Sequence, residues 1–257
     1  MISLKKHTTF ILIILLSFTC FVKSQEVLIS NTQNRNFTSL NGKWRYIVDQ
    51  YETGQIGFIP SGNYTIEDDF SSEKLDYSWI GLRGLKEAFI NRTDEDIKIT
   101  PFEANIKELK PISTLFRRQQ HNSFSFTASM LYKPGSEKDL AGLTCLQNES
   151  SNYVFGITKK GNDYTLLLER NKRKGRFSRE VVSEIVASSK IDIDNPVSLK
   201  VEAKGNDYQF SYSLNGTDFI NLGGTVPGDI LSTNVAGGFT GALIGLYATS
   251  GNNSVTE

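Results

Sequence analysis

Short runs of alternating or apolar residues, separated by turn signals, dominate the chain from residue 123 onward. Residues 123–132 alternate, with Phe124, Phe126 and Ala128 on one face, as expected for a strand with one buried side. The other runs predicted as strands are residues 141–146, 153–157, 164–168, 181–186, 197–201, 208–214 and 243–247. No helix of useful length is predicted after residue 24. Short strands at regular spacing are typical of an antiparallel β-sandwich.

Turn signals fall between these runs. The pentapeptide Lys-Gly-Asn-Asp-Tyr occurs at residues 160–164 and again at 204–208, which we interpret as one hairpin chemistry used twice. Asn215-Gly216 is a further hairpin signal, because both residues accept left-handed backbone angles. Residues 97–99 alternate like a short strand, and Pro101 and Pro111 bound an irregular connection.

The first 24 residues predict a secretory signal peptide. Lys5 and Lys6 precede an apolar core at residues 10–18, which is too short to span a bilayer, and Ser24 ends the cleavage site. The mature chain would then begin at Gln25, be secreted or periplasmic, and have no membrane partner. Lipidation at Cys20 is the alternative, less favoured because Ser17 stands where a Leu is normally required.

Residues 25–65 have an unclear role. Residues 38–54 resemble the opening of secreted family 2 glycosidases, such as bacterial β-glucuronidases, but the resemblance stops there. Trp44, Tyr46 and Val48 alternate with polar residues and predict one strand, and residues 55–63 read as a linker. So few residues cannot bury a core of their own.

Composition excludes several function classes. Lys plus Arg and Asp plus Glu number 28 each, so bulk charge gives no reason to expect a nucleic-acid partner. Beyond the predicted leader, His121 is the only histidine, which argues against a histidine-rich zinc site or a serine–histidine–aspartate triad. Cys145 lies in a predicted strand, and a buried inert thiol is the favoured interpretation over a nucleophile.

Three motifs resemble one known domain. They are Asp68-Asp69-Phe70 with the aromatic run to Trp79, the stretch Arg117-Arg118-Gln119-Gln120-His121, and residues 237–248 with the sequence GGFTGALIGLYA. Together they resemble the C-terminal concanavalin A-like β-sandwich of family 43 glycoside hydrolases of the β-xylosidase type. The resemblance implies an all-β, lectin-like antiparallel sandwich over residues 66–257.

The resemblance also implies where catalysis would lie. In that family a five-bladed propeller precedes the sandwich and carries two Asp and one Glu for an inverting hydrolysis. This chain has no room for a propeller, so no catalytic residue is carried over. In full-length relatives the sandwich packs against the propeller and lends an aromatic side chain to the sugar pocket. Phe239 matches that aromatic, and the alternative is that Phe239 packs inside its own sandwich.

The end of the chain departs from the family pattern. Relatives have a last strand resembling "A-FDWF-Y", which this sequence lacks after residue 250. Its loss would leave an open sheet edge. The predicted strand at residues 44–48 is one candidate to fill the gap, and truncation or rearrangement of the gene is the other interpretation.

Candidate sugar contacts follow from the chemistry of protein–sugar recognition, in which aromatic rings stack on sugar faces and planar polar groups bind hydroxyls. The candidates are Trp79, Arg117, Gln119, Tyr153 and Phe239. For Arg117 and Gln119 the alternative is a structural role at the sheet rim. The basic residues between 172 and 179 predict a solvated hairpin tip, with binding of acidic polysaccharide as the sharper alternative.

No metal site is firmly predicted. Asp68 and Asp69 could ligate a structural Ca²⁺, as in many lectin-like sandwiches, and no other cofactor is expected. The favoured function is a secreted, non-catalytic module that binds a plant-type polysaccharide or oligosaccharide such as xylan or arabinoxylan. The alternatives are a fragment or subunit active only with a glycosidase propeller, and an inactive remnant.

Overall fold

The computed structural model describes residues 65–72, 74–83, 89–92, 96–175, 178 and 180–251. The predicted leader at residues 1–24 and the predicted strand at residues 44–48 lie outside this described part. No helix of the described residues is long and apolar enough to cross a membrane.

The larger sheet has six antiparallel strands in the order β3-β13-β5-β6-β7-β8. The strands are β3 (Ser113–Arg118), β5 (Leu140–Asn148), β6 (Ser151–Lys160), β7 (Asp163–Arg173), β8 (Val181–Ile191) and β13 (Leu243–Thr249). Five of the strands predicted from the sequence therefore lie in this sheet. The strand β13 comes last in the described chain yet lies between β3 and β5.

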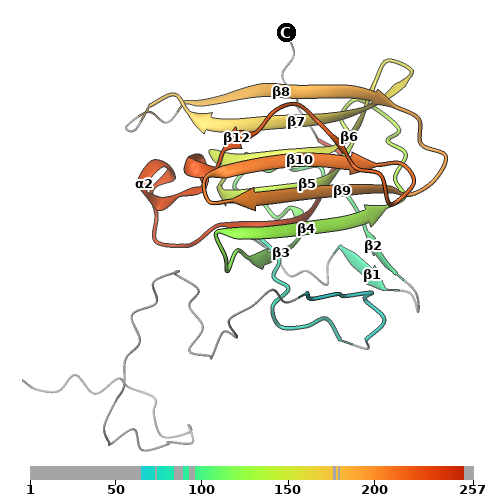
Figure 1. The fold of residues 1–257 in the computed structure, drawn as a ribbon, viewed down its shortest axis with the longest axis horizontal. Helices are drawn as coiled ribbons and strands as arrows, with labels where there is room; N and C mark the ends of the chain where they lie inside the picture. The colour runs from blue at the N-terminus through green and yellow to red at the C-terminus, as the bar shows by residue number, and fades with distance from the viewer. Residues whose placement is uncertain are drawn as a thin grey trace, which may run out of the picture. The chain divides into compact units, whose positions relative to one another are not determined.

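The smaller sheet has five strands and faces the larger one (Figure 1). Its strands are β4 (Ser123–Met130), β9 (Val197–Lys204), β10 (Asp207–Ser213), β11 (Ile220–Asn221) and β12 (Val226–Pro227). A separate pair is formed by β1 (Ile90–Arg92) and β2 (Ile97–Ile99). Among the described residues, helix is confined to the 3₁₀ turn η2 (Gly228–Leu231) and to α2 (Thr233–Ala236). The predicted antiparallel β-sandwich is confirmed.

The main core lies between the two sheets. Phe155 of β6 and Phe210 of β10 meet with ring centroids 5.4 Å apart, and both side chains are fully buried. Cys145 of β5 is also fully buried in this core, and burial strongly raises the pKa of its thiol. The inert-thiol interpretation therefore fits its environment, because only the thiolate is nucleophilic.

A second core covers the opposite face of the six-stranded sheet. The irregular connection between β2 and β3 supplies Ile106 and Ile112, which pack with Phe116 and Tyr247. The Tyr247 hydroxyl accepts a hydrogen bond from the backbone N–H of Ile106 at 2.9 Å. The predicted irregular segment thus serves as a cover, and the larger sheet is buried on both faces.

The repeated pentapeptide forms the expected hairpins. The β6–β7 and β9–β10 turns pair Lys160 with Asp163 and Lys204 with Asp207, leaving two residues in each loop. The glycine that opens each loop has a positive φ angle, 60° at Gly161 and 61° at Gly205. A positive φ at this position is the requirement that selects glycine in such tight turns.

The Asn215-Gly216 signal marks a hairpin with a wider loop than a two-residue turn. The strand β10 does pair with β11, but Tyr212 is the last paired residue before the loop and faces Ile220. The side-chain oxygen of Asn215 accepts hydrogen bonds from the backbone N–H groups of Thr217 and Asp218 at 3.0 and 2.9 Å. This local turn organises the longer loop.

From sequence alone, residues 68–79 suggest a short strand, a polar turn and an aromatic strand, but the segment leading into the sandwich is irregular. Residues 65–72 and 74–79 contain no strand, and only Ile80 bridges to Phe116 of β3. The carboxylate of Asp68 accepts the N–H of Phe70, and that of Asp69 accepts the N–H of Ser71, each at 2.9 Å. These local bonds replace a strand ladder with turns.

Candidate functional site

The glycine-rich loop at residues 237–242 presents one aromatic side chain to solvent. The side chain of Phe239 is fully exposed, with a relative accessibility of 106%. Gly237 and Gly238 precede it with φ angles of 77° and 85°, which glycine adopts readily and other residues rarely. The alternative in which Phe239 packs inside its own sandwich is therefore wrong.

Backbone carbonyls anchor both ends of this loop. The amide nitrogen of Asn148 donates to the carbonyl of Ala236 at 3.2 Å, and the Gln147 amide donates to the carbonyl of Thr240. Both side chains come from the end of β5, and Gln147 is buried. Neither residue was predicted from the sequence; the available signal was a pair of polar side chains at the end of a largely apolar strand.

Gln119, which directly follows β3, supports the same loop. Its backbone N–H donates to the carbonyl of Ala242 at 2.9 Å. Its side-chain oxygen accepts the hydroxyl of Tyr208 at 2.9 Å, and its amide nitrogen donates to the carbonyl of His121 at 3.1 Å. Both polar ends of the Gln119 side chain thus have protein partners, as the structural alternative expects.

Trp79 and Arg117 form one cluster at the start of the sandwich. The indole nitrogen of Trp79 donates to the carboxylate of Asp68 at 2.6 Å, and the Arg117 guanidinium lies 5.0 Å from the indole ring centroid. Arg117 also donates to the hydroxyl of Ser78 at 2.9 Å and lies 3.8 Å from the carboxylate of Asp76. The cluster fastens residues 68–79 to β3.

Neither Trp79 nor Tyr153 has a ring face open to a sugar. Trp79 is 5% exposed and Tyr153 is 0% exposed. The Tyr153 hydroxyl donates to the carbonyl of Pro227 at 2.8 Å, its ring lies 5.7 Å from that of Phe210, and burial raises its pKa to about 12. Of the three aromatic candidates, only Phe239 is placed where another molecule can reach it.

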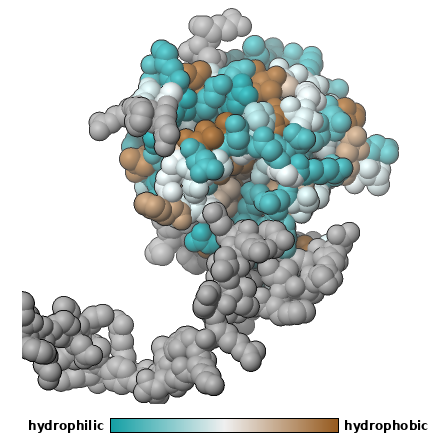
Figure 2. All heavy atoms as spheres, turned by 60° about the vertical axis from the view of Figure 1, so that its left-hand side comes forward, coloured by the Kyte–Doolittle hydropathy of each residue, from teal (hydrophilic) through white to brown (hydrophobic). Residues whose placement is uncertain are grey.

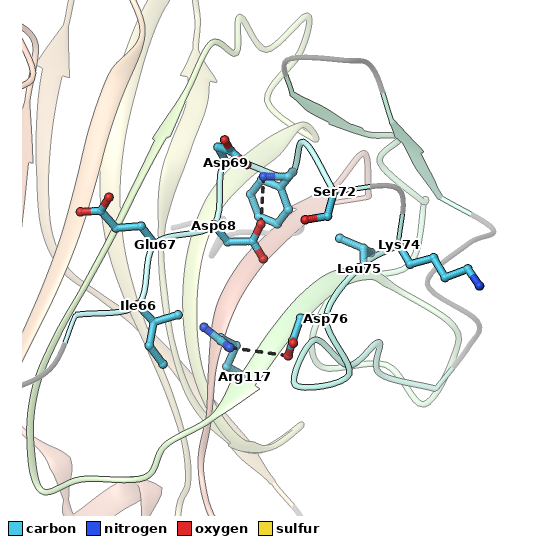
Figure 3. A pocket seen from close by; sticks show the side chains of 10 residues that line it. Ile66, Glu67, Asp68, Asp69, Ser72, Lys74, Leu75, Asp76 and Arg117 are labelled. Carbon is cyan, nitrogen blue, oxygen red and sulfur yellow. Dashed lines mark hydrogen bonds and ion pairs between the residues drawn. The ribbon is translucent and has the colours of Figure 1, made fainter. Parts of the chain in front are cut away.

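Asp68 and Asp69 border a polar hollow of about 310 Å³ beside Arg117 (Figure 3). Both carboxylates already accept backbone N–H groups, and the N–H of Ser71 lowers the pKa of Asp69. No group of three or more His, Cys, Asp or Glu residues within the described ranges could hold a metal ion. The calcium site stays a prediction.

The basic stretch that begins at the end of β7 is partly ion-paired. The Lys174 ammonium lies 3.1 Å from a carboxylate oxygen of Glu180, and Arg173 donates to the hydroxyl of Ser150 at 2.9 Å. Residues 176, 177 and 179 lie outside the described part. The pairing of Lys174 fits the predicted solvated tip.

Comparison with known proteins places this geometry in context. Residues 67–257 match the family model described as the β-xylosidase C-terminal concanavalin A-like domain. A Bacteroides ovatus protein named non-reducing end alpha-L-arabinofuranosidase BoGH43B is 26% identical over 194 residues, covering 75% of this chain and 35% of that protein. A Humicola insolens xylosidase/arabinosidase 43B is 24% identical over 200 residues and is covered to 36%.

Solved structures agree with this match. A GH43_12 crystal structure from a capybara gut metagenome is 42% identical, with a TM-score of 0.69, covering 77% of this chain and 37% of that chain. The GH43 BlXynB protein from Bacillus licheniformis shares the fold at 17% identity, with a TM-score of 0.65. The chain thus spans little more than a third of the length of these relatives.

Proposed function

The chain belongs to the family of β-xylosidase C-terminal concanavalin A-like domains, and on this premise we propose that it serves as the non-catalytic part of a family 43 glycoside hydrolase. In this proposal the sandwich docks onto a catalytic propeller and places Phe239 against the bound sugar. Hydrolysis requires the carboxylates of that propeller. The substrates would be xylose- or arabinose-containing plant polysaccharides, in keeping with the names of the relatives.

The observation that carries the proposal is the exposure of Phe239 on a loop whose ends are held. A large apolar ring that gains nothing from its own core is free to bury its surface against a partner. Val235 of the adjacent helix α2 is 49% exposed and extends the apolar surface beside the loop. The polar supports Gln147 and Asn148 fix the loop before docking, which reduces the entropy lost on binding.

A stand-alone polysaccharide-binding module is the second candidate. It rests on the same exposed ring, because aromatic stacking on a sugar face needs an accessible side chain. The burial of Trp79 and Tyr153 leaves this candidate with only one of the three aromatic contacts expected from the sequence, Phe239. We therefore favour the role as part of an enzyme.

The test compares two assays on the full chain. In the first, the purified chain is sedimented with insoluble xylan. In the second, it is mixed with the propeller portion of the Bacteroides ovatus arabinofuranosidase, and hydrolysis of an aryl arabinofuranoside and an aryl xyloside is followed. We expect no turnover by the chain alone and increased turnover with the propeller portion.

Phe239→Ala should lower that increase by about tenfold or more, because an interface aromatic often contributes on the order of 2 kcal/mol. Leu131→Ala is the control, since Leu131 is 67% exposed but lies on a different loop. Binding to xylan that Phe239→Ala abolishes, without any effect on the propeller portion, would instead support the stand-alone module. Turnover by the chain alone would contradict both functions.

A further inference from the structure

Within the described part of the chain, β4 is an edge strand of the five-stranded sheet. It pairs with β9 on one side, and no strand of the described residues pairs with its other side (Figure 1). The Gly205 N–H donates to the carbonyl of Asn122, so the hydrogen-bonded pairs with β9 fall on even-numbered residues of β4. The backbone groups of Ser123, Ser125, Thr127 and Ser129 therefore point to the open edge.

The other edges carry features that discourage further pairing. The strand β8 carries Glu184 and Lys190 and has a register shift opposite Leu168, β11 has two residues, and β3 is bridged by Ile80. The strand β4 spans eight residues, SFSFTASM, with no charge and no proline. A long neutral edge of this kind is a template for another strand.

The core side of β4 is also incomplete. Its inward side chains Phe124, Phe126, Ala128 and Met130 pack against the main core but stay partly exposed. The residues that pair with them on β9 are Ala203, Val201, Leu199 and Val197, and these are at most 2% exposed. Partly exposed apolar surface therefore reaches the sheet edge at β4.

We propose that a second copy of this chain pairs antiparallel with β4, with the two-fold axis at Thr127. This register opposes Phe126 to Ala128 and Phe124 to Met130 on the core side, so that a large side chain meets a smaller or more flexible one. On the outer face it opposes Ser125 to Ser129. In this register, odd-numbered residues of one copy face odd-numbered residues of the other. These are the residues whose backbone N–H and C=O groups point to the edge.

Charge does not oppose this pairing. The nearest charged side chains on the outer face of β9 are Lys200 and Glu202, which lie beside Thr127 and Ser125. Their ammonium and carboxylate groups are 3.0 Å apart. The part of the strip beside Ser125 and Thr127 is thus neutral, and Lys204 lies beside Ser123 at the end of the strand, away from the axis. The protein as a whole has no net formal charge at neutral pH.

The test is the oligomeric state of the full chain by sedimentation velocity between about 1 and 100 µM, a range that covers typical homodimer affinities. We expect the wild type to dimerise. Thr127→Lys would place two ammonium groups opposite each other across the axis and should raise the dissociation constant at least tenfold. Asn221→Lys is the matched control, since it adds the same charge at an exposed position on β11, the opposite edge of the same sheet.

Thr127 and Asn221 are both exposed, so neither substitution removes a core contact. Amide exchange in β6 checks that each variant is folded. A wild-type monomer across the whole range overturns the proposal, as does a dimer that Thr127→Lys leaves unchanged. A monomer with slowly exchanging Ser125 and Thr127 amides would mean that the edge is covered within one chain, which also overturns it. Phe239→Ala should leave the dimer intact, so the outcome is independent of the proposed function.

Discussion

The two sheets of the sandwich obey the same strand geometry but differ in how they are covered. Along β6 of the larger sheet, eight consecutive residues are buried, whereas β4 of the smaller sheet alternates between exposed and partly buried positions. The second face of the larger sheet is covered by the irregular segment at residues 100–112. The outer surface of the molecule is mixed and largely hydrophilic on the side seen in Figure 2. The larger sheet is therefore internal because a non-strand segment covers its second face, and not because its strands differ in geometry from those of the smaller sheet.

The largest difference in stability between the sheets is expected when one large aromatic ring is removed from each. Phe155→Ala empties a fully buried site on β6 and should cost about 4 kcal/mol of unfolding free energy. Phe126→Ala, at a partly exposed site on β4, should cost about 1–2 kcal/mol, because solvent already reaches it. Urea denaturation measures both, and equal losses would show that the smaller sheet is as fully covered as the larger.

The next-largest effect on stability is expected where two backbones of the larger sheet approach closely. Gly142 pairs with Gly156 across β5 and β6, and a Cβ at Gly142 would lie 2.1 Å from the carbonyl oxygen of Phe155. Gly142→Ala should therefore cost about 3 kcal/mol through forced strand displacement. Gly224→Ala in the loop between β11 and β12 has no neighbouring atom within 4 Å and should change stability by less than about 0.5 kcal/mol. A tolerated Gly142→Ala would contradict close strand approach.

The dependence of stability on alkaline pH tests the burial of Tyr153 between the two sheets. Burial raises the pKa of Tyr153 to about 12 from an ordinary value near 10, so the folded state keeps a proton that the unfolded state loses. Stability should be unaffected by this group below pH 10 and fall by about 1.4 kcal/mol per pH unit between pH 10 and 12. Tyr153→Phe should make the measured decline shallower by that amount. Tyr77→Phe, at a side chain 98% exposed, is the control.

The smallest expected effect concerns the attachment of the leading residues to β3. Trp79→Phe removes the hydrogen bond to Asp68 while keeping most of the ring, and should cost about 1–2 kcal/mol. A double-mutant cycle with Asp68→Ala should give a coupling energy of about 1 kcal/mol. Additive losses would mean that the two side chains act independently. Xylan or propeller assays should be unchanged by Trp79→Phe, because its ring is buried.

Much of the fold was predictable from the sequence because strand periodicity and glycine turns are local signals. The hairpins at Gly161 and Gly205 illustrate this, since each turn is specified by its own residues. The leading segment was mispredicted because Asp68 and Asp69 satisfy backbone groups locally, which a hydrophobic pattern does not reveal. Covering of the larger sheet by residues 100–112 was also invisible, because it depends on contacts distant in sequence.

The candidate site was likewise predictable where local signals decide the structure, and not where distant contacts decide it. Two adjacent glycines at 237 and 238 are a sequence signal for a tight loop, and Phe239 is exposed on the loop that they form. Aromatic residues at Trp79 and Tyr153 looked equally suitable, but alternation tells only which residues share a face and not whether another layer covers that face. Their burial involves Arg117, which is distant from Trp79 in sequence, and Phe210, which lies on the sheet facing Tyr153.

The position of β13 between β3 and β5 dictates an order of assembly. The successive hairpins from β5 to β8 need only neighbouring chain, so they can form while synthesis continues. The strand β3 has no direct ladder to β5 and joins that group only when β13 arrives to pair with both. Until Leu243–Thr249 has emerged from the ribosome, the larger sheet is in two parts, with the edges of β3 and β5 both unpaired. Nascent chains stalled before this point are therefore the form of the protein most dependent on chaperones.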